Sequence, residues 1–188
     1  MRYNAEDTAL IVVDMQNDFC HPDGELYAPE SEEVIDDVNR LVDLVSVIEE
    51  YNILYTRDIH QENDPEFDQW GEHCLEGTWG RSIHDDIVLE GRRIAKDTYD
   101  AFYGSTLDAV LNLLGVESLI ICGTLANVCV QETATSAIAR GYDVNVVEDA
   151  VGYIEEEQKQ RALDHIEFVG GHVIQSSDIS IGIREASE

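Results

Sequence analysis

The sequence predicts an α/β fold, in which a mainly parallel sheet carries helices on both faces. Two observations support this fold class. Short aliphatic runs rich in β-branched residues alternate with longer stretches in which apolar residues recur at helical spacing. The short runs are continuously apolar, which is typical of parallel strands buried on both faces. Such an alternation favours a sheet whose strands are joined by right-handed crossovers.

The predicted elements follow in order along the chain. Strands are expected at residues 9–13, 53–56, 118–122, 143–147 and 172–174. Helices are expected at residues 31–50, 105–114, 127–140 and 154–169. The first helix places its apolar residues on one side, namely Val34, Ile35, Val38, Leu41, Val42, Val45 and Ile48. Residues 57–104 break this rhythm, and an irregular segment of that length inside a compact domain usually has a function.

The chain is strongly acidic, with 40 acidic and 11 basic side chains among 188 residues and a formal net charge of −29. Such a surface repels phosphate backbones and anionic lipid heads, so neither nucleic acid nor a membrane is an expected partner. The acids are scattered among apolar runs, which favours a salt-adapted, halophilic surface over a disordered acidic tail. Only Lys96 and Lys159 are lysines, and a lysine retained on such a chain suggests a specific task.

The length suits a single domain over residues 1–188. No apolar run reaches the roughly 18 residues that span a bilayer, and the first residues lack a secretion signal, so a cytoplasmic protein is expected. The four cysteines are widely spaced, which argues against a disulfide framework or a thiol-rich zinc site. No glycine-rich nucleotide-binding motif follows a strand, so no organic cofactor is expected.

A candidate nucleophile lies beyond the strand at 118–122, because ligands of open α/β sheets bind beyond the carboxyl ends of the strands. Cys129 sits where a loop enters a predicted helix, so backbone N–H groups and the helix dipole would favour its thiolate. The same amides could hold the oxyanion that forms when sulfur attacks a carbonyl. The alternative is a small apolar side chain packed under the helix.

Two further candidates are Asp14, which ends the first strand, and Lys96, which precedes a turn. Each has an ordinary explanation, because Asp14 alone suggests a helix cap and Lys96 alone a solvated charge. Together with Cys129 they could form a catalytic set. The carboxylate would take the thiol proton and pass it to a leaving amine, and the cation would steady the charges. The hypothesis requires the three side chains to meet in space.

A candidate metal site consists of Asp58, His60 and His73. One carboxylate and two imidazoles suit zinc, iron or manganese and leave positions for water or substrate. Asp58 and His60 point to the same side of an extended segment, because side chains there alternate with a period of two. His73 must fold back from the irregular segment.

Three aromatic residues are candidates for substrate binding. Phe19 and Trp70 could form a flat apolar slot, and Tyr103 could place a hydroxyl at its edge. Aromatic residues near a crevice are, however, more often part of the core.

At these residues the sequence strongly resembles the isochorismatase-like cysteine hydrolases, and within them the nicotinamidases and their relatives. The resemblance runs from about Ala9 to Ile174 and depends on short motifs that are weak singly and specific in this order. They are Asp14-Met15-Gln16-Asn17-Asp18-Phe19, Arg57-Asp58-Ile59-His60, Trp70-Gly71-Glu72-His73-Cys74, Lys96 before Tyr99-Asp100-Ala101-Phe102, Gly123 through Val130, and Gly141-Tyr142 with Asp149-Ala150.

The resemblance implies a three-layer α/β/α fold with a six-stranded sheet and a triad of Asp14, Lys96 and Cys129. In that pattern Cys129 attacks an amide carbonyl, Asp14 acts as general base and then as acid, and ammonia leaves before water hydrolyses the thioester. The backbone amides of Leu125 and Cys129 would form the oxyanion hole. A cis peptide bond between Thr124 and Leu125 is also implied.

The resemblance further implies a divalent metal ion, zinc with iron or manganese as alternatives, that binds the ring nitrogen of nicotinamide. Its ligands match Asp58, His60 and His73, and the ring-stacking aromatics match Phe19 and Trp70. Members that hydrolyse the vinyl ether of isochorismate usually lack the cysteine and the metal ligands, so an amidase is favoured.

The loop at residues 61–65 departs from the nicotinamidase pattern, because it lacks a further histidine. Asn63, Asp64 or a water could complete the coordination, or the ion could be absent. The leading hypothesis is hydrolysis of nicotinamide to nicotinate and ammonia for NAD salvage, by a homo-oligomer. One alternative keeps the triad and changes the amide to a carbamoyl or ureido compound, and isochorismate is a less favoured substrate. The non-enzymatic alternative is an inactive α/β module that binds a small molecule.

Overall fold

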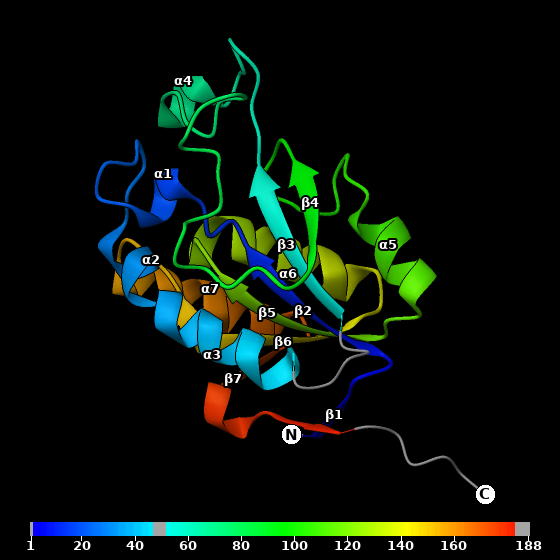
Figure 1. Cartoon of the computed structure of the whole chain (residues 1–188). Helices are drawn as coiled ribbons and strands as arrows, with labels where there is room; N and C mark the ends of the chain where they lie inside the picture. The colour runs from blue at the N-terminus through cyan, green and yellow to red at the C-terminus, as the bar shows by residue number, and fades with distance from the viewer. Residues whose placement is uncertain (1, 47–51, 183–188) are drawn as a thin grey trace, which may run out of the picture.

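The computed structural model describes residues 2–46 and 52–182 (Figure 1). Six parallel strands form the central sheet in the order β4-β3-β2-β5-β6-β7. These strands are β2 (Thr8–Val13), β3 (Asn52–Asp58), β4 (Arg92–Lys96), β5 (Ser118–Gly123), β6 (Asp143–Val151) and β7 (His172–Ile174). A separate parallel pair joins β1 (Arg2–Asn4) to β8 (Ser180–Gly182).

Helices cover both faces of the sheet and produce a three-layer α/β/α arrangement. The helical elements are α1 (Asn17–Cys20), α2 (Pro29–Glu33), α3 (Ile35–Ser46), α4 (Phe67–Trp70), α5 (Leu107–Leu114), the π-helical turn η1 (Ala126–Val130), α6 (Gln131–Ala139), α7 (Glu156–Phe168) and the 3-10 turn η2 (Ser176–Asp178). The buried side of α3 packs on one face, and α5, α6 and α7 pack on the other. The pleat of β2 serves both layers, because Leu10 and Val12 face α3 while Ile11 faces the opposite side.

The predicted fold class is confirmed, and each predicted strand matches one of the central strands. The sixth strand, β4, was not predicted, because Arg92, Arg93 and Lys96 interrupt the apolar pattern on this edge strand. The helix predicted at 31–50 is divided into α2 and α3 at Val34, and residues 47–50, Ile48 among them, lie outside the described residues.

The carboxyl ends of four adjacent strands meet at one edge of the sheet, toward which the arrowheads of β3 and β4 point in Figure 1. β3 and β4 end together, because Asp58 is the register partner of Lys96. Gly123 ends β5 at a φ of 109°, and a Cβ there would lie 2.1 Å from the Val13 carbonyl oxygen. This close approach brings the loop after β5 beside the end of β2. Within the described residues, no helix is both long and apolar enough to cross a membrane.

Candidate active site

Asp14 follows β2 as a fully buried carboxylate. Its backbone takes a φ of 46°, and its N–H donates to Thr56 Oγ1 at 3.2 Å. The Thr56 hydroxyl in turn donates to Asp14 Oδ1 at 2.7 Å. β3 therefore holds the Asp14 carboxylate in place and leaves its second oxygen for another partner.

That partner is Lys96 at the end of β4, whose side chain is also buried. Lys96 Nζ lies 2.8 Å from Asp14 Oδ2, 3.1 Å from Asp58 Oδ1 and 3.6 Å from Cys129 Sγ. An ammonium has three N–H donors and no acceptor, so three acceptors satisfy it. The three side chains predicted to meet at the sulfur are thus brought together by the structure.

Cys129 occupies the π-helical turn η1, which leads into α6, and 6% of its surface is exposed. The peptide bond between Thr124 and Leu125, which lies just before η1, is cis, as the resemblance implied. The Thr124 N–H donates to the Val13 carbonyl at 2.9 Å, and Ser31 Oγ lies 2.6 Å from Thr124 Oγ1. In the described part of the chain no backbone carbonyl accepts from the Leu125 N–H, which leaves that amide available as an oxyanion donor.

Burial dominates the protonation of this cluster. It raises the pKa of the Cys129 thiol well above its ordinary value, although the Lys96 ammonium acts in the opposite direction. It also raises the pKa of Asp14, again against the lowering effect of Lys96. For Lys96, burial favours the neutral amine, but the carboxylates of Asp14 and Asp58 outweigh it and raise its pKa. Burial thus favours the neutral thiol of Cys129, whereas the sequence predicted a thiolate stabilised by the helix, so the sulfur needs a base before it attacks.

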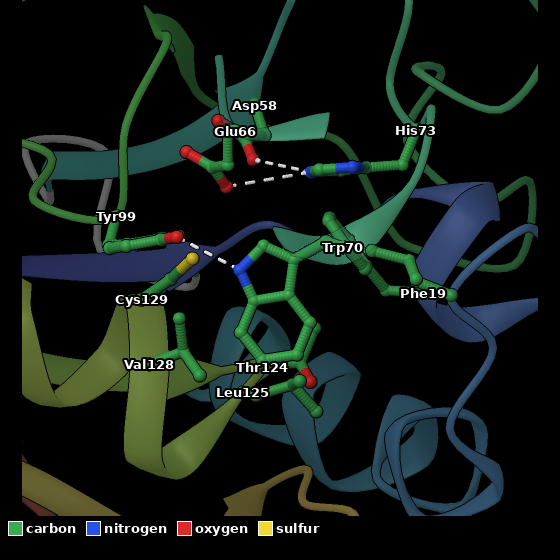
Figure 2. A pocket seen from close by; sticks show the side chains of 11 residues that line it. Phe19, Asp58, Glu66, Trp70, His73, Tyr99, Thr124, Leu125, Val128 and Cys129 are labelled. Atoms are coloured by element: carbon green, nitrogen blue, oxygen red, sulfur yellow. Dashed lines mark hydrogen bonds and ion pairs between the residues drawn. The ribbon is translucent and has the colours of Figure 1, made fainter. Parts of the chain in front are cut away.

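A second cluster, the metal-binding group, adjoins the first and consists of Asp58, His60, Glu66 and His73. One ligand atom from each residue lies within 4.8 Å of the others. Asp58 Oδ2 lies 3.1 Å from His60 Nε2. His73 Nε2 lies 3.7 Å from Asp58 Oδ2 and 3.7 Å from Glu66 Oε1 (Figure 2). Two imidazoles and two carboxylates fit a divalent ion such as zinc, iron or manganese.

The far nitrogens of both imidazoles have partners. His73 Nδ1 lies 2.9 Å from the Gly71 carbonyl oxygen, and His60 Nδ1 lies 3.1 Å from Asp64 Oδ2. Burial lowers the pKa of His60, but the contacts with Asp58 and Asp64 outweigh it and raise that pKa to about 9. In both residues Nε2 is the nitrogen that remains for a metal ion.

The side chain of Gln16 is fully buried and connects the segment after Asp14 to Asp58 of the second cluster through its hydrogen bonds. Its amide accepts from the Asp58 N–H at 2.7 Å and donates to the Asp58 carbonyl at 2.8 Å and the Arg81 carbonyl at 2.8 Å. The backbone of Asp58 is thus held from both sides by a residue two positions after Asp14.

A pocket that is partly open to solvent lies over Cys129. Its walls include Leu26 and the ten residues labelled in Figure 2, which are Phe19, Asp58, Glu66, Trp70, His73, Tyr99, Thr124, Leu125, Val128 and Cys129. Trp70 Nε1 donates to the Tyr99 hydroxyl at 2.9 Å. Most of the lining is apolar, and the polar groups gather at the sulfur and at the metal-binding group. A flat small molecule with polar atoms at two ends would match this distribution.

The comparisons with known proteins agree with this geometry. A model of the isochorismatase domain matches residues 8–178. The chain belongs to the isochorismatase family. The nicotinamidase of Escherichia coli K12 is 28% identical to this isochorismatase-family hydrolase over 174 residues, which cover 75% of this chain and 81% of that protein.

Two solved structures of isochorismatase-fold enzymes are similar over most of the chain. The pyrazinamidase of Pyrococcus horikoshii, solved in complex with zinc, is 34% identical with a TM-score of 0.83 and covers 90% of this chain and 99% of its own. The N-carbamoylsarcosine amidase of Thermoplasma acidophilum is 32% identical with a TM-score of 0.80 and covers 90% and 96%. The chain is thus nicotinamidase-related and has amidases among its structural relatives.

One predicted substrate-binding residue of this isochorismatase-family protein does not reach the pocket. Tyr103 lies in a turn closed by its own N–H and the Asp100 carbonyl, and 70% of its side chain is exposed. Tyr99 lines the pocket instead. Phe19 and Trp70 are both in the lining, where they were expected.

Sequence reasoning also missed Glu66, the fourth member of the metal-binding group. The loop residues expected to complete the coordination do not join it, because Asn63 is exposed and Asp64 contacts the far nitrogen of His60. The sequence signal for Glu66 was its position after Pro65 and directly before Phe67, the first residue of α4. In a chain with 40 acids, one more acid does not stand out.

Proposed function

We propose that this isochorismatase-family hydrolase converts nicotinamide and water to nicotinate and ammonia, with Cys129 as the nucleophile. The single observation that carries the proposal is the position of Lys96 Nζ between Asp14 at 2.8 Å and the Cys129 sulfur at 3.6 Å. A buried acid, a buried cation and a thiol that meet at the base of a pocket form the set that thiol-dependent amide hydrolysis needs.

In the first half of the reaction, the Cys129 sulfur attacks the amide carbonyl carbon. Asp14, whose Oδ2 shares the Lys96 ammonium with the Cys129 sulfur, accepts the S–H proton as the C–S bond forms. Burial raises the pKa of Asp14, so its carboxyl is a better base than an exposed aspartate. The backbone amides of Leu125 and Cys129 are the proposed donors to the oxyanion. Asp14 then gives the proton to the amide nitrogen, the C–N bond breaks, and ammonia leaves.

In the second half, water attacks the thioester carbonyl and Asp14 accepts a proton from it. The C–S bond breaks, Asp14 returns its proton to the sulfur, and the carboxylic acid product loses its own proton to solvent and becomes the carboxylate. Lys96 stays protonated throughout, because its raised pKa reflects two carboxylate neighbours. Its role is to balance the charge that moves between sulfur and Asp14.

The metal-binding group adds a second anchor for the substrate ring. Asp58, His60, Glu66 and His73 would hold a divalent ion, with zinc the leading candidate because of the two imidazoles. Such an ion supplies a Lewis acid for a ring nitrogen. The walls that include Phe19 and Trp70 would receive the ring itself.

The relatives support the proposal. The E. coli protein at 28% identity is a nicotinamidase, and the P. horikoshii enzyme at 34% identity was solved with zinc. A nicotinamide amidase acts in NAD salvage, which is the role we propose.

The deciding experiment measures ammonia release from nicotinamide by the parent, by Cys129→Ala and by Cys20→Ala, a control at a buried thiol outside the pocket. We expect no turnover in Cys129→Ala, near-normal turnover in Cys20→Ala, and a reduced rate after treatment with a chelator. Turnover by Cys129→Ala would contradict the proposed chemistry. A folded parent without turnover on any amide would favour the inactive binding module.

A second candidate substrate is a carbamoyl or ureido compound, which the 32% identity to the N-carbamoylsarcosine amidase favours. It would use the same Cys129 chemistry without a ring nitrogen to bind the ion. A panel of nicotinamide, pyrazinamide and N-carbamoyl amino acids separates the two substrates. Chelation should slow only the ring amides, and isochorismate should not react.

A further inference from the structure

We propose that Asp64 is a positioning residue for the metal-binding group, and that its carboxylate sets the zinc affinity of the site by orienting His60 and Glu66 together. The inference rests on the proposed metal-dependent function, because it concerns how this chain prepares the group for an ion.

The first contact is with His60. Asp64 Oδ2 lies 3.1 Å from His60 Nδ1, and the His60 side chain is fully buried while 20% of the Asp64 side chain is exposed. The contact is an ion pair that is not aligned as a hydrogen bond, and because a carboxylate has no proton to donate, it favours the proton on Nδ1. Nε2 faces the metal-binding group 3.1 Å from Asp58 Oδ2, so a bound ion would replace the proton on Nε2 while Asp64 keeps the proton on Nδ1.

The second contact is with Glu66. Asp64 Oδ1 accepts the Glu66 N–H at 2.9 Å, which fixes the backbone just before α4. The Asp64 carboxylate therefore contacts two of the four ligand residues, His60 and Glu66. The Asp64 backbone is held as well, because its N–H donates to the Gln61 carbonyl at 3.2 Å and its carbonyl accepts from Phe67 at 3.1 Å.

The two imidazoles of the group are supported differently. His73 has a backbone acceptor, the Gly71 carbonyl, whereas His60 depends on the Asp64 side chain. Support of this kind typically changes metal affinity about 10- to 100-fold when it is removed. A single substitution at Asp64 therefore tests the support of His60 without touching a ligand residue.

The test is the dissociation constant for Zn²⁺ alone, measured on the full chain near neutral pH by competition with a chromophoric chelator. The variants are Asp64→Ala and Asp64→Asn, and the matched control is Asp68→Asn, which removes an exposed charge four residues away. We expect a rise of about 10- to 100-fold in the dissociation constant for both Asp64 variants and a change within about twofold for the control.

Asp64→Asn is informative because it is nearly isosteric. Its one oxygen can accept from either the Glu66 N–H or His60 Nδ1. If it bonds Glu66, its amide N–H₂ faces His60 and favours the tautomer that carries the proton on Nε2. Unfolding of the metal-free variants is followed in parallel, because a merely structural residue would lower stability without a separate loss of zinc affinity. If Asp64→Ala does not fold, Asp64→Asn decides.

An unchanged zinc affinity in a folded Asp64 variant would overturn the inference, and so would a parent that binds no zinc. The measurement needs no substrate. A parent that binds zinc tightly, loses it in both Asp64 variants and releases no ammonia from nicotinamide would contradict the proposed function and support the role of Asp64.

Discussion

The Asp58 carboxylate joins the two halves of the site, because its Oδ1 lies 3.1 Å from Lys96 Nζ while its Oδ2 lies 3.1 Å from His60 Nε2. Asp58 and Lys96 are also register partners on β3 and β4. The ammonium lowers the pKa of Asp58 despite the burial that opposes it. Asp58 is therefore a direct contact between the ion pairs of Lys96 and the metal-binding group.

Lys96→Met should destabilise the protein by about 3 kcal/mol or more, because it leaves the buried carboxylates of Asp14 and Asp58 without their cation. The other lysine provides the control. Lys159 contacts the Tyr153 ring at 4.8 Å on the surface helix α7, so Lys159→Met should change stability by less than about 1 kcal/mol. Urea unfolding measures both, and equal effects would argue against a central role for the Lys96 ion pairs.

Gly123→Ala should destabilise the fold by several kcal/mol, because the new Cβ would meet the Val13 carbonyl oxygen at 2.1 Å. Gly141 also has a positive φ, 93°, but nothing lies within 4 Å of its added Cβ. Gly141→Ala should therefore lose only about 1–2 kcal/mol from backbone strain. Comparison of the two unfolding midpoints separates the steric contact from the strain.

Cys129 should be the thiol that iodoacetamide alkylates in the folded protein. It opens into the pocket, whereas Cys20, Cys74 and Cys122 are fully buried. Because its pKa is raised, the alkylation of Cys129 should be slow near neutral pH and become faster as the pH rises and the thiolate forms. Peptide mapping by mass spectrometry gives the site and rate. Equal labelling of all four cysteines would contradict the site geometry.

Stability should fall at alkaline pH in part through Tyr55. Burial raises its pKa to about 12, compared with 10.0 unperturbed, and its hydroxyl donates to the Val88 carbonyl at 2.6 Å. Because the folded state holds the proton more tightly, this contribution is present below pH 10 and is lost as the pH rises from about 10 to about 12. The loss amounts to about 2 kcal/mol.

The measurement is the free energy of unfolding across that pH range. Tyr55→Phe should show a shallower decline than the parent, whereas Tyr103→Phe, at an exposed phenol, should follow the parent. Tyr3 has a similarly raised pKa of about 12, so some decline remains in the Tyr55 variant. Parallel curves for all three proteins would contradict the assignment.

The melting temperature should rise with salt, because the net charge of −29 makes the folded surface repel itself. We expect an increase of roughly 10 °C between about 0.1 M and about 2 M KCl. Sucrose at equal osmolality is the control for preferential exclusion. A melting temperature that salt leaves unchanged would contradict the proposed salt-adapted surface.

Much of the fold could be predicted because the central strands are apolar on both faces and alternate with helices of clear periodicity. β4 could not, since an edge strand with Arg92 and Arg93 exposed does not show that pattern. The division between α2 and α3 was also missed, because α2 has no apolar residue except Pro29 and the apolar spacing begins only at Val34.

The site was predictable where residues follow predicted strands, as Asp14 and Cys129 do, whereas Lys96 ends the unpredicted β4 and stood out as one of only two lysines. Tyr103 was wrongly assigned to the pocket. A turn determines whether Tyr99 or Tyr103 faces the pocket, and the sequence pattern does not show which way the chain turns. Glu66 was missed for a related reason. Its position depends on how an irregular segment folds back over β3, and periodicity is uninformative there.

The pairing of Asp58 with Lys96 across β3 and β4 has an evolutionary consequence. Because successive side chains in a strand point to opposite faces, an insertion or deletion of one residue inside β4 would send the ammonium into the wrong layer. The long connection between these strands carries Glu66, Trp70 and His73 and is free of that constraint. Descendants of this protein should therefore change substrate by remodelling that connection while the length of the two strands stays the same.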